Sequence, residues 1–493
     1  MSVPRRIAIV GSDCHAWLAA AALKRAFRHL DIDILVIEEE RPQQTTLGRW
    51  TLPSLRGTHA LMGVKEAELV ARTGATFKLA TEHHGWQSER SRYVHAHGEI
   101  GSELQGIAFY KYLLLQAALG RHEPIEDYSL AALAARMGRF ARPMSHSALT
   151  SSFTYGFHLD EAAYTTYLRE HAEKLGVRRH GGRISDVLLR DDGSIAAVQL
   201  DHDVRVAADF YIDCSGCEPT LITQLSSEAR IDWSAWLLND RVISMRAAPV
   251  PEARAVTETS ALDGGWMWRI PLARSSVVGL VYSSAFLADA QAVAHLQKSA
   301  PGVEGQAVRA SIAQGRRRNF WERNCLALGD AAVQLEPLVG ANLHLTQLGI
   351  AIFIEMFPLG PTSRLEAIEY NHIIGEHADA LRDFTIAHYR AGRTRAGEYW
   401  AATQAAPLPE RLAARLDLYR AAARLNLLDN ETFEEADWAW VLLGTGCTPD
   451  TIGLHVRSTL ERTRLDDIAT LRESIRQLAA SMPRHMDFVR QHG

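Results

Sequence analysis

The sequence has few cysteines and no long apolar run, and each shortage excludes a class of protein. Five cysteines in 493 residues are too few and too scattered for a disulfide framework. Cys214 and Cys217 have CxxC spacing, but no second pair or histidine cluster accompanies them, so we expect no metal site. No stretch approaches the ~18 uninterrupted apolar residues of a membrane span, and the apolar run at residues 7–10 is far too short for a signal sequence. We therefore expect a reduced, cytoplasmic protein with no membrane association.

Lysine is also scarce, and the charge balance gives no reason to expect binding to nucleic acid. The 53 basic and 58 acidic residues leave a formal net charge of −5. Only six of the basic residues are lysine, so 47 are arginine (53 − 6). Hydrophobic residues make up 47% of the chain, which excludes general disorder, and the length suits about three domain-sized units.

The chain begins with the pattern of a βαβ unit. Residues 6–10 form an apolar run that ends at Gly11, a helical pattern follows from Cys14 to about residue 29, and residues 32–38 form a second buried-looking strand. A strand, a helix and a strand within about 35 residues predict a parallel sheet.

The first turn of this unit departs from the G-x-G-x-x-G pattern that binds dinucleotides. Residues 11–16 keep only the first glycine, Gly11. Ala16 is a mild replacement for the third, whereas Asp13 puts a negative charge where a phosphate would approach. Glu38, 27 residues after Gly11, is placed to hold an adenosine ribose. The candidate dinucleotide contacts are Gly11, Ser12, Asp13, Cys14, Ala16 and Glu38.

Further patterns predict the rest of the fold. A helix is expected from Asp160 to Gly176, a hairpin around residues 191–194, and a strand over residues 204–213. Strand-like runs on either side of residues 266–271 suggest an antiparallel layer, and the pattern is helical with arginine-rich polar faces from about Ser363. We expect an α/β domain over residues 1–225 and 300–360, an antiparallel substrate layer over 226–299, and a helical region over 361–493.

Short motifs follow one another through the chain in a fixed order. They are T-L-P-S-L at 51–55, G-A-T-F-K-L at 74–79, D-C-S-G at 213–216, W-M-W-R-I-P at 266–271, V-Y-S-S at 281–284, G-D-A at 329–331 and E-P-L at 336–338. Residues 382–384, 388–389 and 438–446 extend the set into the C-terminal helices. In order and spacing, this set resembles the flavin-dependent tryptophan halogenase family over nearly the whole chain.

The resemblance implies a fold and a chemistry. It implies an FAD/NAD(P)-binding, Rossmann-like flavoprotein monooxygenase fold with an antiparallel substrate-side sheet and a C-terminal helical region. In the family, FAD reduced by a separate flavin reductase reacts with oxygen and with chloride or bromide, and hypohalous acid travels through a tunnel to an aromatic substrate. Homodimers are common in the family.

The resemblance also assigns roles to individual residues. Lys78 falls at the family's catalytic lysine, and Asp330 at the acid that contacts the flavin ribityl chain. Trp266 and Trp268 fall at the tryptophans that block the tunnel between substrate and flavin.

At other positions the sequence departs from the family. Val339 stands where the family has its catalytic glutamate, and a valine can neither accept a proton nor polarise a halogen species. Gly340, Ala341 and Asn342 follow in the halide loop, where the family has serine and threonine. Beside the flavin, Gly48-Arg49-Trp50 replaces Gly-Glu-Ala, so that Arg49 could contact phosphate or compensate for Asp13.

Three functions remain open from the sequence. The chain is a halogenase-like FAD enzyme with altered chemistry on an indole-type substrate, or a flavin monooxygenase acting on a bulky substrate. Alternatively, it is a non-catalytic binding or partner subunit that does not bind FAD and pairs with an active paralogue. The residues do not identify a substrate.

Overall fold

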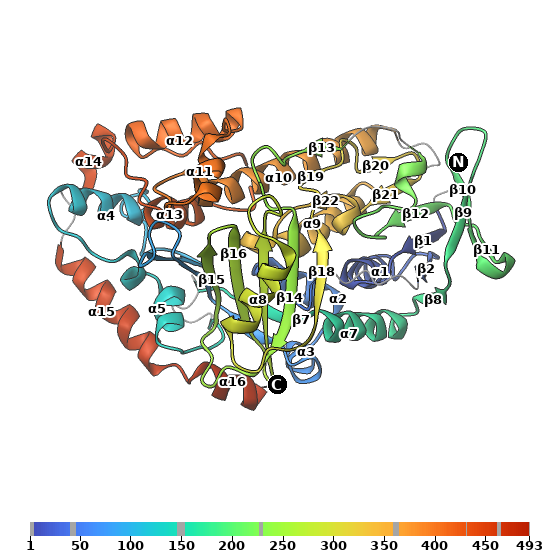
Figure 1. The fold of residues 1–493 in the computed structure, drawn as a ribbon, viewed down its shortest axis with the longest axis horizontal. Coiled ribbons are helices and arrows are strands. Elements are labelled where there is room, and N and C mark those ends of the chain that lie inside the picture. The colour runs from blue at the N-terminus through green and yellow to red at the C-terminus, as the bar shows by residue number, and fades with distance from the viewer. Residues whose placement is uncertain are drawn as a thin grey trace.

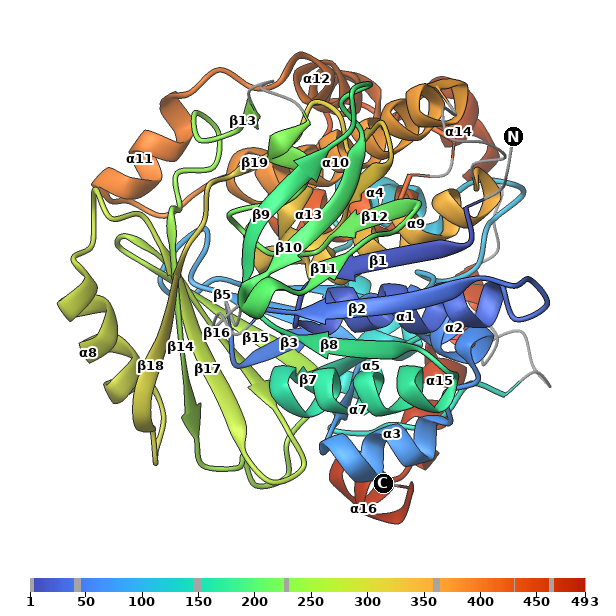
Figure 2. The same cartoon turned by 90° about the vertical axis from the view of Figure 1, so that its right-hand side faces the viewer.

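A parallel sheet forms the amino-terminal layer, as predicted. The computed structural model describes residues 4–39, 46–144, 153–225, 230–357, 364–429, 431–460 and 465–492. Its first sheet has the order β20-β21-β12-β1-β2-β8, and α1 joins β1 to the parallel strand β2 (Figures 1 and 2). The bounds are β1 Arg6–Val10, α1 Cys14–Ala26, β2 Asp33–Glu38, β8 Arg178–Gly181, β12 Phe210–Asp213, β20 Trp321–Glu322 and β21 Cys325–Ala327. The predicted βαβ unit is confirmed.

Local signals also determine the next helix and the hairpin. Helix α7 (Glu161–Lys174) begins after Asp160, whose side chain accepts a hydrogen bond from the Ala163 N–H. Strands β9 (Ile184–Leu189) and β10 (Ile195–Leu200) pair antiparallel across the Asp-Asp-Gly-Ser turn.

The single strand predicted over residues 204–213 is wrong. The segment divides into β11 (Arg205–Val206), which pairs with β10, and β12, which pairs with β1 in the parallel sheet. The break lies where the chain passes from one sheet to another, and a periodicity within one segment does not reveal such a change of partner.

The predicted antiparallel layer is a seven-stranded sheet in the order β18-β14-β17-β16-β15-β5-β6. Its members are β5 Ala80–His84, β6 Arg92–Ala96, β14 Arg241–Ala247, β15 Val256–Leu262, β16 Gly265–Pro271, β17 Ser276–Tyr282 and β18 Glu304–Ser311. One junction, β15 with β5, is parallel. Helix α8 (Asp289–Ser299) lies on the outer side of this sheet (Figure 2).

A small three-stranded sheet in the order β3-β7-β4 carries two of the segments singled out in the sequence. Strand β3 (Gly48–Trp50) is the departing flavin-side segment, and β4 (Thr76–Lys78) ends in the candidate lysine. Both pair with β7 (Gly156–Asp160), and Trp50 and Thr76 lie opposite the same residue, His158. Segments far apart in the sequence are thus held in one rigid unit.

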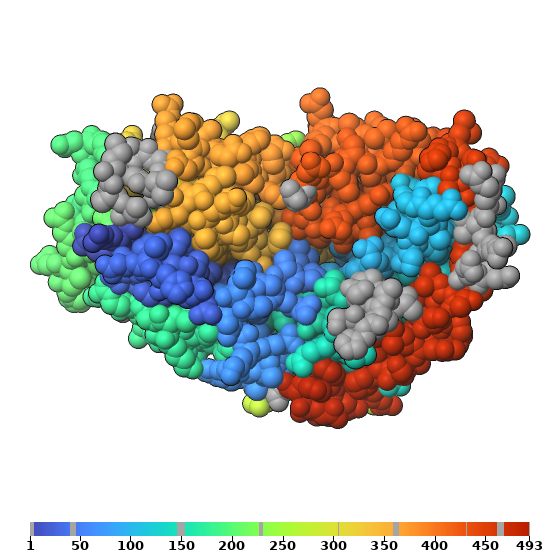
Figure 3. All heavy atoms as spheres, turned by 180° about the vertical axis from the view of Figure 1, so that it is seen from behind, coloured from blue at the N-terminus to red at the C-terminus, as the bar shows by residue number. Residues whose placement is uncertain are grey.

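The remaining described elements are mostly helices. They are α2 Ser54–Met62, α3 Glu66–Thr73, α4 Phe109–Ala118, α5 Leu130–Arg136, α9 Asn342–Glu355, α10 Arg364–Arg390, α11 Glu398–Ala405, α12 Glu410–Ala422, α13 Glu435–Gly444, α14 Leu454–Leu460, α15 Leu465–Ser481 and α16 His485–His492. A further three-stranded sheet has the order β13-β19-β22, with the bounds β13 Ile231–Asp232, β19 Gly315–Arg316 and β22 Val333–Gln334. The predicted helical start at Ser363 lies outside the described residues. In Figure 3 the C-terminal residues run along one edge and around the end opposite the amino-terminal sheet.

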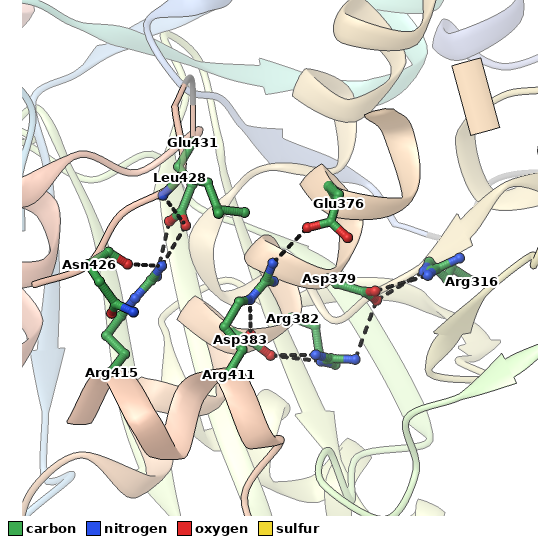
Figure 4. Close-up of polar contacts among 10 residues, drawn as sticks. All are labelled: Arg316, Glu376, Asp379, Arg382, Asp383, Arg411, Arg415, Asn426, Leu428 and Glu431. Atoms are coloured by element: carbon green, nitrogen blue, oxygen red, sulfur yellow. Dashed lines mark hydrogen bonds and ion pairs between the residues drawn. The ribbon is translucent and has the colours of Figure 1, made fainter. Parts of the chain in front are cut away.

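Arginine–carboxylate pairs join these helices to each other and to the α/β body (Figure 4). Asp379 of α10 accepts two hydrogen bonds of 2.9 Å from Arg316 of β19. Asp383, which is 1% exposed, accepts hydrogen bonds from Arg382 of the same helix and from Arg411 of α12. Part of the arginine-rich face expected on these helices is therefore buried in ion pairs.

Candidate functional site

One cavity collects much of the sequence-predicted site. Its walls come from β3, β14, β16, β18 and the loop that leads into α9. Six predicted residues line it, namely Gly48, Arg49, Trp268, Asp330, Gly340 and Asn342. The cavity is small, about 60 Å³, and it is partly open to solvent.

The dinucleotide-type turn is capped by its own side chain. Asp13 Oδ1 accepts hydrogen bonds from the N–H groups of His15 (3.0 Å) and Ala16 (3.1 Å) at the start of α1. Free N–H groups at a helix N-terminus are what bind the phosphates of a dinucleotide. Gly11 is needed for packing, since a Cβ there would lie 2.5 Å from the Cys214 carbonyl oxygen. The N–H groups that would bind a phosphate at this turn therefore bind the Asp13 carboxylate instead.

Arg49, expected to contact phosphate or to compensate for Asp13, is bound to a different acid. Its Nε and NH2 atoms donate to Glu161 Oε2 and Oε1 at 2.7 and 3.2 Å, and both side chains are largely buried. Burial, and then the nearby carboxylates of Asp330 and Glu161, raise the pKa of Asp13 to about 7. The pKa of Asp330 is also raised, chiefly by burial. Three carboxyl groups thus surround one arginine.

The other predicted cofactor contacts also have partners within the chain. Glu38 Oε1 accepts from Trp17 Nε1 at 3.1 Å, and its Oε2 accepts from Arg179 at 2.8 Å. Asp330 Oδ2 lies 3.9 Å from the thiol sulfur of Cys217, a weak donor. Cys14 and Ala16 are fully buried within α1.

These residues do not fit FAD in the arrangement that they adopt. The N–H donors of the turn are taken by Asp13, and Arg49 is engaged by Glu161. A second arginine, Arg230, lies near Asp330 and offsets part of its charge. A pyrophosphate placed there would have to displace the Asp13 carboxyl group from these donors and would lie near the carboxyl groups of Asp330 and Glu161. The arrangement therefore supports no reaction step through a flavin.

The candidate lysine lies in the interior. Lys78 is 2% exposed, and its Nζ lies 2.7 Å from His97 Nε2. Burial lowers the pKa of Lys78 to about 7, and burial, followed by the charge of Lys78, lowers the pKa of His97 well below its usual value. The His97 imidazole is therefore neutral, and its Nε2 can accept a hydrogen bond from Lys78 Nζ. His95, in β6, has its ring centroid 6.2 Å from that of His97, and its Nε2 lies 2.8 Å from Asp437 Oδ1.

The halide loop is apolar and tightly packed. Val339 is 4% exposed and Ala341 is fully buried, while Asn342 donates to the Leu335 carbonyl oxygen at 2.8 Å. Gly340 has φ +68°, and a Cβ there would lie 2.5 Å from Cδ1 of Trp50. The indole of Trp50 thus takes the space that a side chain at position 340 would need.

The two predicted tunnel tryptophans are both buried on β16 and project to the same side of it, two residues apart. Trp268 lies against Trp50, with 5.3 Å between the ring centroids, and crosses Gly279, where a Cβ would lie 2.2 Å from its ring. Trp266 packs at 6.4 Å from Trp86. Only Trp268 reaches the cavity wall.

Sequence reasoning missed Glu161 and His97. Glu161 comes from 112 residues beyond Arg49 and resembles an ordinary acid in the first turn of a helix. The H-x-H pattern at 95–97 was a usable signal, because residues two apart in extended chain project to the same side, and the two rings do lie close together.

The described residues show neither a metal-ligand cluster nor a membrane-spanning helix. Among them, no three His, Cys, Asp or Glu side chains gather as metal ligands would. No helix in the described ranges is long and apolar enough to cross a bilayer.

The fold defines an α/β protein with a Rossmann-like, largely parallel sheet, a second, mixed sheet and helical additions. Comparison with known proteins is more specific. The tryptophan halogenase family model matches residues 6–459. The solved flavin-dependent halogenase Xcc4156 from Xanthomonas campestris is 31% identical with a TM-score of 0.94, covering 99% of this chain and 98% of that one. BrvH, a flavin-dependent halogenase from Brevundimonas sp. BAL3, is 31% identical with a TM-score of 0.92, covering 99% of both chains. The tryptophan 7-halogenase RebH from Lentzea aerocolonigenes is 25% identical over 99% of each chain. The chain belongs to the tryptophan halogenase family.

Proposed function

We propose that this chain is a non-catalytic member of the tryptophan halogenase family, acting as a binding or partner subunit, for example of an active paralogue. The observation that carries the proposal is the halide loop. Val339, buried at the position that the resemblance gives to the family's glutamate, offers no acid or base. Gly340, beside it, has its side-chain space filled by Trp50. A halide or hypohalous acid would find an apolar wall there.

A turnover assay tests this proposal. The protein is supplied with FAD, a separate flavin reductase, oxygen and either bromide or chloride, and a panel of indoles is analysed by mass spectrometry. We expect no halogenated product above that of the reductase alone, while an active flavin-dependent halogenase run in parallel converts its substrate. Product that appears with the wild-type chain and disappears with Lys78→Ala would refute the proposal.

A second candidate function is halogenation of an aromatic, indole-type substrate at Lys78. The short contact between Lys78 Nζ and His97 Nε2 favours it, because it holds the Lys78 side chain in a fixed position in the interior. FAD and chloride or bromide would then be required, with a separate flavin reductase as the partner. In the same assay this candidate predicts product that is lost in both Lys78→Ala and His97→Phe.

The binding role predicts association with another chain. Sedimentation of the purified protein, alone and mixed with a paralogue that does turn over, distinguishes a homodimer from a heterodimer. A monomer under both conditions would contradict the partner-subunit role.

A further inference from the structure

We infer that side chains of the protein itself occupy the dinucleotide site, so that the chain does not bind FAD or other nucleotide diphosphates. The Asp13 carboxylate takes the place of the phosphate at the helix, the Arg49–Glu161 pair takes the place of a free phosphate-binding cation, and Trp50 narrows the flavin-ring end. This inference is independent of the halide loop, because it concerns cofactor binding and not halogenation.

The helix end carries the first step. Asp13 occupies two backbone donors at the start of α1, at 3.0 and 3.1 Å. A phosphate must displace this carboxylate, and it then meets the same negative charge nearby. Aspartate is also among the best N-cap residues, so the helix is complete without a ligand.

The cation carries the second step. Arg49 is joined to Glu161 by two parallel hydrogen bonds, the strongest geometry available to an arginine and a carboxylate. Releasing Arg49 to a phosphate would leave Glu161 buried without its counter-ion, and breaking a buried pair is strongly unfavourable. The Arg49 guanidinium is therefore not available to bind a cofactor phosphate.

The ring end carries the third step. Trp50 lines the cavity and packs against both Trp268 and the backbone of Gly340. The Trp50 indole thus takes up space at this end of a small cavity of about 60 Å³. Side chains of the chain itself therefore occupy the helix N-terminus and narrow the ring end of the cofactor position.

Titration of the full-length protein with FAD and with riboflavin tests the inference, read out by flavin fluorescence in the absence of halide and reductase. We expect no saturable FAD binding by the wild-type chain at tens of micromolar. Asp13→Gly should raise FAD affinity at least about tenfold, since removing one like charge near a diphosphate is worth more than that. Asp13→Gly with Trp50→Ala should raise it further. The matched control is Ser129→Gly, which replaces the N-cap of α5 and should change nothing.

Riboflavin has no phosphate and probes the ring end alone. Trp50→Ala should improve its binding and Asp13→Gly should not. The inference is overturned by micromolar FAD binding to the wild-type chain. It is also overturned if neither Asp13→Gly nor the double variant gains affinity, or if Asp13→Gly helps riboflavin as much as FAD. Halogenation could fail whatever this titration gives, so the two proposals can be told apart.

Discussion

Replacing Asp13 by asparagine should stabilise the protein, and more so at higher pH. Asparagine keeps the N-cap hydrogen bonds at the start of α1 but removes the charge. In the folded chain the pKa of Asp13 is raised to about 7, from an ordinary value of 3.8. The folded state therefore binds the proton more tightly than the unfolded state, and stability falls as pH rises from about 4 to about 7.

The size of this effect follows from the two pKa values. Their difference, at ~1.36 kcal/mol per pKa unit, corresponds to about 4 kcal/mol above pH 7. Because Asp13 is only half-buried and solvent screens part of the interaction, we expect about half of this, about 2 kcal/mol. At about pH 5 the gain from Asp13→Asn should be below about 1 kcal/mol, because the folded wild-type chain is then protonated.

Urea unfolding of the wild type and Asp13→Asn at about pH 5 and about pH 8 measures the difference. Ser129→Ala is the control, because it removes an uncharged N-cap and should cost about 1 kcal/mol at both pH values. Equal pH dependence of the wild type and Asp13→Asn would show that Asp13 is not a destabilised carboxylate, and the reasoning about the crowded acids would fail.

Three further perturbations test other parts of the structure. Lys78→Met should raise the free energy of unfolding by up to about 5 kcal/mol at about pH 6 and by little above about pH 10. The reason is that the pKa of Lys78 is about 7 in the folded chain, below its ordinary 10.5, so burying the lysine costs free energy only at pH values where it is protonated in the unfolded chain. A gain of equal size at both pH values in urea unfolding would contradict this. Gly340→Ser should lower the free energy of unfolding by about 2–3 kcal/mol, and adding Trp50→Ala should recover part of this loss in a double-mutant cycle. If the effects of the two substitutions are additive, Trp50 does not fill the space beside Gly340. Arg415→Ala should cost about 3–5 kcal/mol by leaving its buried glutamate partner alone, against less than about 1 kcal/mol for the exposed pair of Arg490; equal midpoints of thermal unfolding would refute the difference.

The parts of the fold that follow from local patterns could be predicted from the sequence. The βαβ unit depends on the apolar runs at 6–10 and 33–38, and helix α7 on an N-cap aspartate at its first turn. These signals act within a few residues, so the sequence carries them in full.

What depends on partners distant in sequence could not be predicted. The chain between β11 and β12 changes sheet, and the sequence around residue 208 gives no sign of which neighbour each half will take. Likewise, Arg49 was a candidate phosphate contact because of its charge and the place beside the flavin that the family resemblance gives it. Its actual partner, Glu161, is a matter of packing between β3 and α7.

The departures from the family pattern are coupled in space, which the order of residues along the sequence hides. Asp13 interacts electrostatically with Arg49, and Arg49 forms an ion pair with Glu161. The indole of Trp50 packs against Gly340. Substitutions in contact are not independent in free energy, so restoring one family residue while its neighbours stay changed restores only part of the site or creates a clash. A glycine at position 13 alone frees the N–H groups at the start of α1 but leaves the Arg49–Glu161 pair and Trp50 in place, and a serine at position 340 alone collides with Trp50. The site is therefore better understood as an alternative packing that is complete in itself than as a family site with single residues missing.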